Sequence, residues 1–178
     1  VIPHITVSSK ENFEPHQWRR MEESVMTLSN VEAVSPSMNA GGVVATSKGS
    51  NGVLVNGIKV NSEYGVSVIH NFFVSGELEN LRDNSWGIAL GESLAKELGV
   101  QLGESVDLFS PSIAINPLTP RVSFRSFKVV GIFKVGNQEI DSNLVIANLE
   151  AVRALFRIRQ KHNGFRIKLR DVLDVDET

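Results

Sequence analysis

The sequence predicts an α+β domain built from two lobes. Three observations support this fold class. Strand–helix–strand patterns occur near both ends of the 178-residue chain, the segment between them is β-rich, and that segment contains one short helix. We expect one α+β lobe from residues 1–70 and 136–178. An inserted β-rich lobe is expected from residues 71–135.

The first strand–helix–strand unit lies at the N-terminal end. Alternating apolar residues predict a strand within 2–9. A helix is expected over 15–28, because Pro15 suits a first helical turn and apolar residues recur at spacings of three and four. Its apolar face carries Trp18, Met21, Val25 and Leu28. An extended apolar pattern at 31–34 predicts a second strand that ends before Pro36.

A β-hairpin is expected next. Short apolar strands at 43–45 and 53–55 flank a polar segment that contains Asn51 and Gly52. Asn-Gly is the dipeptide most typical of two-residue hairpin turns, so it predicts the position of the turn.

Two further helices are expected in the second half of the chain. One covers 90–99, because leucines recur at spacing four and Gly99 is a typical C-cap. The other follows Asn148, a typical N-cap, and lies between strands at 144–147 and 165–169. This last strand–helix–strand unit closes the first lobe.

The inserted lobe contains two predicted strands that form a hairpin. One covers 104–109 and the other lies within 122–135, where the apolar phase slips between Phe124 and Phe127 and predicts a β-bulge. The loop at 110–120 joins them. A connection of this length inside a hairpin is uncommon and often functional.

Composition excludes several classes of protein. The chain has 18 Lys and Arg against 20 Asp and Glu, a net charge of −2, which is unlike a nucleic-acid-binding domain. It has no Cys, which excludes disulfide scaffolds, iron–sulfur clusters and thiolate zinc sites. No apolar run reaches the roughly 18 residues of a membrane span. Since no initiator Met or signal peptide is present and an acidic run ends the sequence, we expect an excised domain of a longer protein.

Residue patterns typical of catalysis or metal binding are missing. The four His, at positions 4, 16, 70 and 162, do not have metal-ligand spacing, and no phosphate-binding loop is present. Ser93 lies in a segment that loosely matches a serine-nucleophile elbow but lacks the final Gly. We therefore predict a protein that is not an enzyme, with no metal and no cofactor.

The loop at 110–120 has the most unusual composition in the chain. It holds three of the six prolines, no charge, and the apolar residues Ile113, Ile115 and Leu118. Prolines restrict the chain, so one interpretation is a stiff, projecting apolar loop that docks onto another protein. The alternative is a loop that folds back and buries Ile113 and Ile115 in its own lobe.

A basic strip is expected beside this loop. Arg121, Ser123 and Arg125 share one face of an extended strand at spacing two, and Val122 and Phe124 share the other. This arrangement would fit a partner with an apolar groove and an acidic rim.

Four segments together resemble a known family. They are Gly76-Glu77-Leu78, GIALGESLAKELGV at 87–100, GESVDLFSP at 103–111 and FKVVGIF at 127–133. In their order and spacing, the chain resembles the periplasmic domain of the LolC/LolE membrane subunits of the lipoprotein-releasing ABC transporter, within the wider MacB-like periplasmic domains.

The resemblance implies a fold of two lobes, called Porter and Sabre, between the first two transmembrane helices of a subunit. The α+β lobe of residues 1–70 and 136–178 would be Porter-like, and the inserted lobe of residues 71–135, with its projecting hairpin loop, would be Sabre-like. It implies a place at the periplasmic face of the inner membrane of a Gram-negative bacterium. The implied partners are a LolA-like periplasmic lipoprotein carrier, the lipoprotein substrate, a second membrane subunit and a cytoplasmic ATPase subunit. Membrane attachment would be through segments outside this sequence.

In LolC-type members, a protruding hairpin called the Hook engages the carrier. The loop and the strand after it resemble that hairpin, which implies a partner-binding set of Asn116, Pro117, Leu118, Thr119, Pro120, Arg121, Phe124 and Arg125. Three departures matter. Thr119 replaces a typical Gly, Phe124 replaces a polar residue, and Asp107 stands where a basic residue would extend the binding surface. LolC-like, LolE-like and hybrid subunits stay open.

Two alternatives to carrier binding remain. A MacB-like efflux or permease domain would share the fold and bind a periplasmic adaptor protein instead. A hydrolase that uses Ser93 is a more distant alternative.

Overall fold

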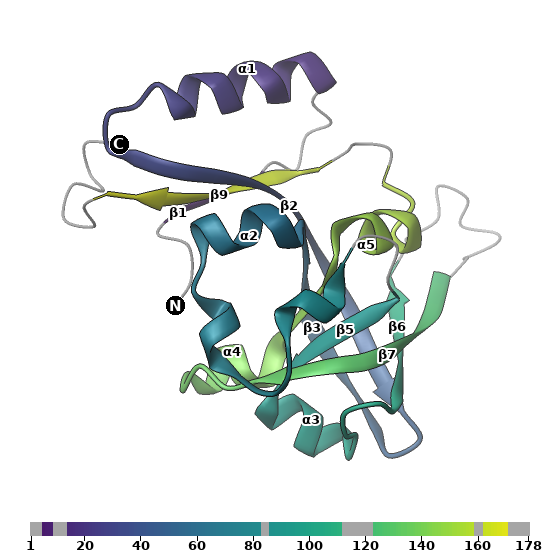
Figure 1. The fold of residues 1–178 in the computed structure, drawn as a ribbon. Coiled ribbons are helices and arrows are strands. Elements are labelled where there is room, and N and C mark those ends of the chain that lie inside the picture. The colour runs from purple at the N-terminus through teal and green to yellow at the C-terminus, as the bar shows by residue number, and fades with distance from the viewer. Residues whose placement is uncertain (1–4, 9–13, 83–85, 112–122, 159–161, 171–178) are drawn as a thin grey trace, which may run out of the picture.

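The computed structural model describes residues 5–8, 14–82, 86–111, 123–158 and 162–170 (Figure 1). The strands are β1 (Ile5–Ser8), β2 (Val31–Thr46), β3 (Gly49–Ile58), β4 (Phe73–Gly76), β5 (Gly87–Gly91), β6 (Ser105–Ser110), β7 (Ser123–Phe133), β8 (Leu144–Asn148) and β9 (Gly164–Leu169). The α-helices are α1 (Pro15–Met26), α2 (Val60–Val66), α3 (Glu92–Leu98), α4 (Gln138–Asn143) and α5 (Leu149–Leu155). Two short 3₁₀ helices are η1 (Ile69–Phe72) and η2 (Leu78–Leu81).

The described strands form one mixed sheet, in the order β1-β9-β2-β3-β8-β5-β7-β4, and β6 pairs with both β2 and β7. Pairings β3–β8 and β5–β7 are parallel and the others are antiparallel. Strands and helices follow one another without a regular βαβ alternation, which confirms the predicted α+β class. Strand β2 pairs with β6, and β8 pairs with β5. Since β2 and β8 were assigned to one lobe and β5 and β6 to the other, the sheet continues across both. The division into 1–70 with 136–178 and 71–135 stays a prediction.

Strand β2 does not end before Pro36, as the sequence predicted, but continues to Thr46. Its first part pairs with β9, where Pro36 lies opposite Phe165, and its pairing with β3 begins only at Ser37. Proline has no N–H to donate, so it is tolerated where a strand has a partner on one side only. Pro36 occupies such a position, and this explains why it does not stop the strand.

The predicted hairpin is present, but its predicted turn is wrong. Thr46 pairs with Gly49, so the turn is Ser47-Lys48, and Asn51 and Gly52 lie inside β3. The Asn51 amide donates to Glu97 Oε2 at 3.0 Å. A tertiary contact with α3 therefore uses the residue that the local pattern assigned to a turn.

The helix predicted over 90–99 begins later, at Glu92. Leu90 belongs to β5, of which every residue is buried. The C-cap is confirmed, since Gly99 has φ = 59° and ψ = 39°, the left-handed conformation that favours glycine. The predicted N-cap is confirmed too, because Asn148 Oδ1 accepts hydrogen bonds from the main-chain N–H groups of Glu150 and Ala151 at 2.8 and 3.4 Å.

The bulge predicted between Phe124 and Phe127 is absent from the β6–β7 ladder, which is in continuous register from Phe109↔Phe124 to Val106↔Phe127. Phe124 is 61% exposed, so it is not a core residue out of phase. A register shift does occur on β7, in its pairing with β5, between Val129 and Gly131.

The core consists of three clusters of buried apolar residues. The largest packs α3 and α5 on the sheet, and the second lies under α2, η1 and η2. The third joins α1 to β9 and the start of β2, where Trp18 packs edge-on against Phe165 with ring centroids 5.1 Å apart. Helices α1 and α2 lie on opposite faces of this part of the sheet (Figure 1). Helices α2 and α4, of 7 and 6 residues, were not predicted, because fewer than two turns give little periodicity. Helices α3 and α5 are equally short, but the cap residues Gly99 and Asn148 indicated them.

Candidate partner-binding site

The predicted site lies at one end of the β6–β7 hairpin. The last pair of the ladder is Ser110 with Ser123. Strand β6 is held on its other side by β2, so the end of the hairpin rests on paired strands. Of the predicted partner-binding residues, the structure places Phe124 and Arg125. The other six, Asn116, Pro117, Leu118, Thr119, Pro120 and Arg121, lie outside the described residues, and so do Ile113 and Ile115.

One face of the hairpin end carries a stacked aromatic pair, in which Phe124 is exposed and Phe109 is half-buried. Phe109 and Phe124 are cross-strand partners, and their rings stack with centroids 5.2 Å apart and an interplanar angle of 22°. Side chains alternate along a strand, so these rings point away from the buried Val106 and Leu108. An exposed ring already stacked on a neighbour, as Phe124 is on Phe109, offers apolar contact area at a low cost in side-chain entropy.

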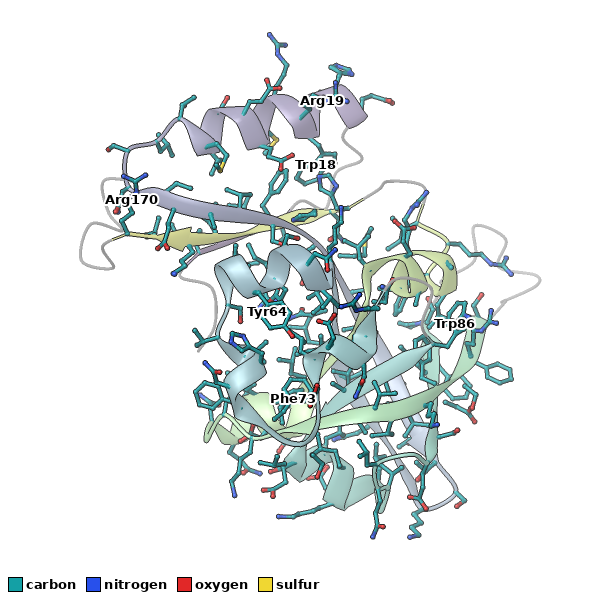
Figure 2. All side chains as sticks on the ribbon, viewed as in Figure 1. Trp18, Arg19, Tyr64, Phe73, Trp86 and Arg170 are labelled. Carbon is teal, nitrogen blue, oxygen red and sulfur yellow. The ribbon has the colours of Figure 1, made fainter. Side chains whose placement is uncertain are left out.

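The other face carries a cation held on an aromatic ring. The guanidinium carbon of Arg125 lies 3.5 Å from the centroid of the Trp86 ring. Trp86 in turn packs edge-on against the fully buried Phe127, at 5.5 Å (Figure 2). A guanidinium over an indole face is attracted by the ring quadrupole. Arg125 is itself exposed. The core therefore fixes its position through Trp86 while its charge stays at the surface.

Sequence reasoning missed Trp86, which has no patterned neighbours to signal its role. Trp86 precedes β5, and Gly87 of β5 pairs with Lys128 of β7. This pairing brings the Trp86 ring close to β7, where it orients the Arg125 side chain. The alternation predicted for Ser123 and Arg125 on one face and Phe124 on the other agrees with the ladder register. The hairpin end therefore presents an aromatic surface on one side and a positive charge on the other.

Of the residues considered for catalysis or metal binding, Ser93, His16, His70 and His162 lie among the described residues. The Ser93 hydroxyl donates to Gln138 Oε1 at 3.4 Å, so its described partner is an amide and not a general base. No group of three or more His, Asp or Glu that could hold a metal occurs in the described part of the chain. Among the described helices, none is long and apolar enough to cross a bilayer.

A buried ion pair lies away from the hairpin and was not predicted. Arg166 on β9 and Glu63 on α2 approach to 2.8 Å, and their side chains are 7% and 0% exposed. Burial raises the pKa of the Glu63 carboxyl from 4.5 to about 7, and the nearby Arg166 charge opposes this shift. Burial also lowers the pKa of Arg166, and Glu63 opposes that change. No local sequence pattern could signal the pair, because it joins elements far apart in the chain.

The raised pKa of Glu63 predicts a pH-dependent stability. The folded protein holds this proton more tightly than the unfolded chain does, so the contribution is complete below pH 4.5 and is lost as the pH rises through about 7. The loss is of the order of 3 kcal/mol. Urea unfolding of the native protein and of Glu63→Gln, at several pH values from 4.5 to 8, measures it as the difference between the two curves. Parallel curves would contradict the prediction.

Comparison with known proteins identifies the family. The family model described as the MacB-like periplasmic core domain matches residues 2–178. Among curated relatives, proteins named lipoprotein-releasing system transmembrane protein LolC are 27% identical over 96% of this chain in Neisseria meningitidis and 29% over 95% in Xylella fastidiosa. A protein named LolE from Haemophilus influenzae is 31% identical over 61% of this chain. The chain spans about 40% of the length of the LolC relatives, 41% and 40%, and 26% of the LolE relative.

Solved structures share the fold at low sequence identity. The extracellular domain of the noncanonic ABC-type transporter YknZ from Gram-positive bacteria superimposes with a TM-score of 0.59 at 11% identity, over 97% of this chain and 88% of that one. The periplasmic region of MacB from Actinobacillus actinomycetemcomitans gives 0.56 at 15% identity, over 93% and 74%. With the family model covering nearly the whole sequence, these findings show that the chain belongs to the MacB-like periplasmic core domain family.

Proposed function

We propose that this chain is the non-catalytic periplasmic domain of an ABC transporter membrane subunit that releases lipoproteins from the inner membrane. The loop at 110–120 and the adjoining strand hand the lipoprotein to a LolA-like periplasmic carrier. Support comes from the family and from relatives named as lipoprotein-releasing transmembrane proteins. The remaining parts of the complex are a second membrane subunit and a cytoplasmic ATPase subunit, at the inner membrane of a Gram-negative bacterium.

The observation that carries the proposal is the end of the β6–β7 hairpin. Phe124 adds an exposed aromatic ring on one face, and Arg125 adds a positive charge on the other. Both lie directly after the proline-rich, uncharged loop. Binding surfaces commonly combine a few large anchors with charged residues at the rim. The proposed set is Asn116, Pro117, Leu118, Thr119, Pro120, Arg121, Phe124 and Arg125.

A charged residue at the proposed anchor should weaken carrier binding. We expect Leu118→Asp to cost about 2 kcal/mol of binding free energy, which is about a 30-fold increase in Kd, because a carboxylate cannot enter an apolar groove without losing its hydration. Isothermal titration of the variant with a purified LolA-like carrier measures the change.

Leu102→Asp is the matched control for this experiment. Leu102 is 47% exposed and lies between α3 and β6, away from the hairpin end. The Leu102→Asp variant should therefore bind the carrier as the native protein does. Equal affinities for Leu118→Asp and Leu102→Asp would remove the loop as the anchor. Carrier binding that is absent from the native protein too would contradict the proposed function itself.

A MacB-like efflux or permease role with a periplasmic adaptor protein is the alternative. The periplasmic region of MacB shares the fold, which alone does not select the partner. The same titration with a purified adaptor in place of the carrier separates the two roles. LolC-like and hybrid subunits predict carrier binding through the loop, and a LolE-like subunit predicts contact with the lipoprotein instead.

A further inference from the structure

A cavity of about 460 Å³ lies on the opposite side of the sheet from α1, and the hairpin end does not contribute to it. Its floor is the face of five neighbouring strands, β1, β9, β2, β3 and β8. Its other wall is formed by α4 and η1. The volume is within the range typical of small-molecule sites, roughly 300–1,000 Å³.

The floor consists of two groups of paired residues that are offset along β2, because Arg166 pairs with Ser35, four residues before Asn39. Thr6 on β1 pairs with Arg166 on β9, and Asn39 on β2 pairs with Asn56 on β3. Asn56 in turn pairs with Ile146 on β8. Neighbouring strands lie about 4.8 Å apart, so the floor from β1 to β8 extends about 19 Å. The cavity is therefore elongated across the strands.

Polarity changes along this floor. The β1 and β9 end carries Thr6, Ser8 and Arg166. The β3 and β8 end carries Leu54 and Leu144, and Ile140 of α4 faces them. Leu54 is 51% exposed although it lies on the sheet face, so this apolar end is incompletely covered by the chain itself. The one carboxylate among the described lining residues, that of Glu139, is exposed and lies on α4 at the apolar end.

Two polar groups in the cavity have capacity for further partners. Arg166 is 6% exposed, and within the described residues its polar contact is the ion pair with Glu63. A guanidinium has five N–H donors, so one carboxylate does not saturate it. Asn56 Oδ1 is buried, and no hydrogen-bond partner for it occurs among the described residues. Buried polar groups are nearly always hydrogen-bonded, so this unpaired oxygen leaves the Asn56 side chain, which lines the cavity, with hydrogen-bonding capacity that a bound group would satisfy.

We propose that this cavity binds a small anionic amphiphile, with its acidic head group at Arg166 and its hydrocarbon chain against Leu54, Leu144 and Ile140. The amide of Asn56 lies between the two ends, and either its N–H or its oxygen can face the head group. A carboxylate lies near each end, Glu63 against Arg166 and Glu139 on α4. Within the described lining, only the Arg166 end has a guanidinium to offset the negative charges, so the acidic head group is favoured there.

An added peptide strand is a poorer occupant than an amphiphile. Such a strand binds through main-chain hydrogen bonds to a free sheet edge. The strands in the middle of this floor are already paired on both sides, β9 with β1 and β2, and β3 with β2 and β8. A hydrocarbon chain needs no main-chain partners and gains free energy from burial alone.

Binding of dodecanoate to the native 178-residue chain tests the proposal, with dodecanoate kept below its critical micelle concentration. Isothermal titration should show saturable binding at one site. Leu54→Trp fills the apolar end, and we expect its affinity to fall by about tenfold or more. Leu102→Trp is the matched control, because Leu102 is similarly exposed, at 47% against 51%, and does not line the cavity. Absence of saturable binding, or equal loss in both variants, would overturn the proposal.

The head group is tested by changing its charge and the residues that face it. Dodecanol and dodecyltrimethylammonium should bind the native protein at least about tenfold more weakly than dodecanoate. In the double variant Glu63→Leu/Arg166→Met this preference should disappear while dodecanol still binds. Dodecyl phosphate distinguishes a phospholipid-like head from a carboxylate. Equal binding of all head groups by the native protein would overturn the role of Arg166. Carrier binding is measured separately, so either result leaves the proposed function to its own test.

Discussion

Glu63→Leu is expected to lower the free energy of unfolding by about 4 kcal/mol at pH 8, because it leaves the Arg166 charge buried without a partner. Glu63 is fully buried, so the place of the missing carboxylate is closed to bulk water, although Arg166 also lines the cavity on its other side. The pair also joins α2 to β9, and removing one member should loosen that contact. A protein of this size has a total stability of about 5–15 kcal/mol, so the loss is a large fraction of it.

The double variant Glu63→Leu/Arg166→Met separates the cost of an unpaired charge from the value of the pair. Apolar side chains of similar volume often replace a buried ion pair without loss. Since burial raises the pKa of Glu63 to about 7 despite the nearby Arg166, desolvation exceeds the attraction. We therefore expect the double variant to unfold at a urea concentration equal to or above that of the native protein. A double variant as unstable as Glu63→Leu would show that the ion pair itself stabilises the fold.

Local signals in the sequence predicted those elements whose determinants are local. Pro15 begins α1, Asn148 caps α5, and Gly99 ends α3 in the left-handed conformation. Each of these residues acts through its own main chain or that of neighbours within one turn. Their positions are therefore readable without knowledge of the rest of the fold.

The local predictions failed where tertiary contacts decide the structure. Leu90 continues the spacing of the α3 leucines but lies in β5, since a buried strand and a buried helix segment have the same apolar composition. Asn51 fits a turn but bonds to Glu97. Pro36 fits a strand end but sits where β2 has one partner. In each case contacts with residues distant in the sequence override the local preference of the residue.

The candidate site was predictable in part for the same reason. Alternation along a strand places Phe124 and Arg125 on opposite faces, and this follows from sequence alone. The contact of Arg125 with the Trp86 ring depends on which strands become neighbours. So does the cavity, which lies on the face of the sheet opposite α1. Trp86, Arg166 and Asn56 reach their partners only through sheet order, which single-residue patterns do not encode.

Glycines in the segments that carry the family resemblance have a physical role in the fold. A Cβ on Gly76 would overlap the Val130 carbonyl of the neighbouring strand, and Gly76 also has φ = 68°. A Cβ on Gly131 would meet the Phe73 ring, with Cδ1 at 2.9 Å. A Cβ on Gly91 would overlap the main chain of Asp141. These motifs therefore encode close packing of the sheet and its helices, whereas the proposed partner specificity resides in the loop and the hairpin end.

Gly91→Ala should consequently destabilise the fold strongly without touching the hairpin end. Gly91 ends β5 and is the N-cap of α3, and an added Cβ would lie 2.6 Å from the Asp141 carbonyl carbon and 2.7 Å from its Cα. Asp141 cannot retreat easily, because its carboxylate accepts hydrogen bonds from the Val135 and Gly136 main-chain N–H groups at 2.9 and 3.0 Å. We expect a loss of about 3 kcal/mol or more in urea unfolding.

Gly52→Ala is the matched control for this substitution. A Cβ added to Gly52 would have no neighbour within 4 Å among the described residues, so the variant should change stability by less than about 1 kcal/mol. Gly52 also lies in a strand, as Gly91 does, so both substitutions add a methyl group to extended backbone. Equal stability of the two variants would show that α4 moves freely relative to β5, and the packing role of Gly91 would be wrong.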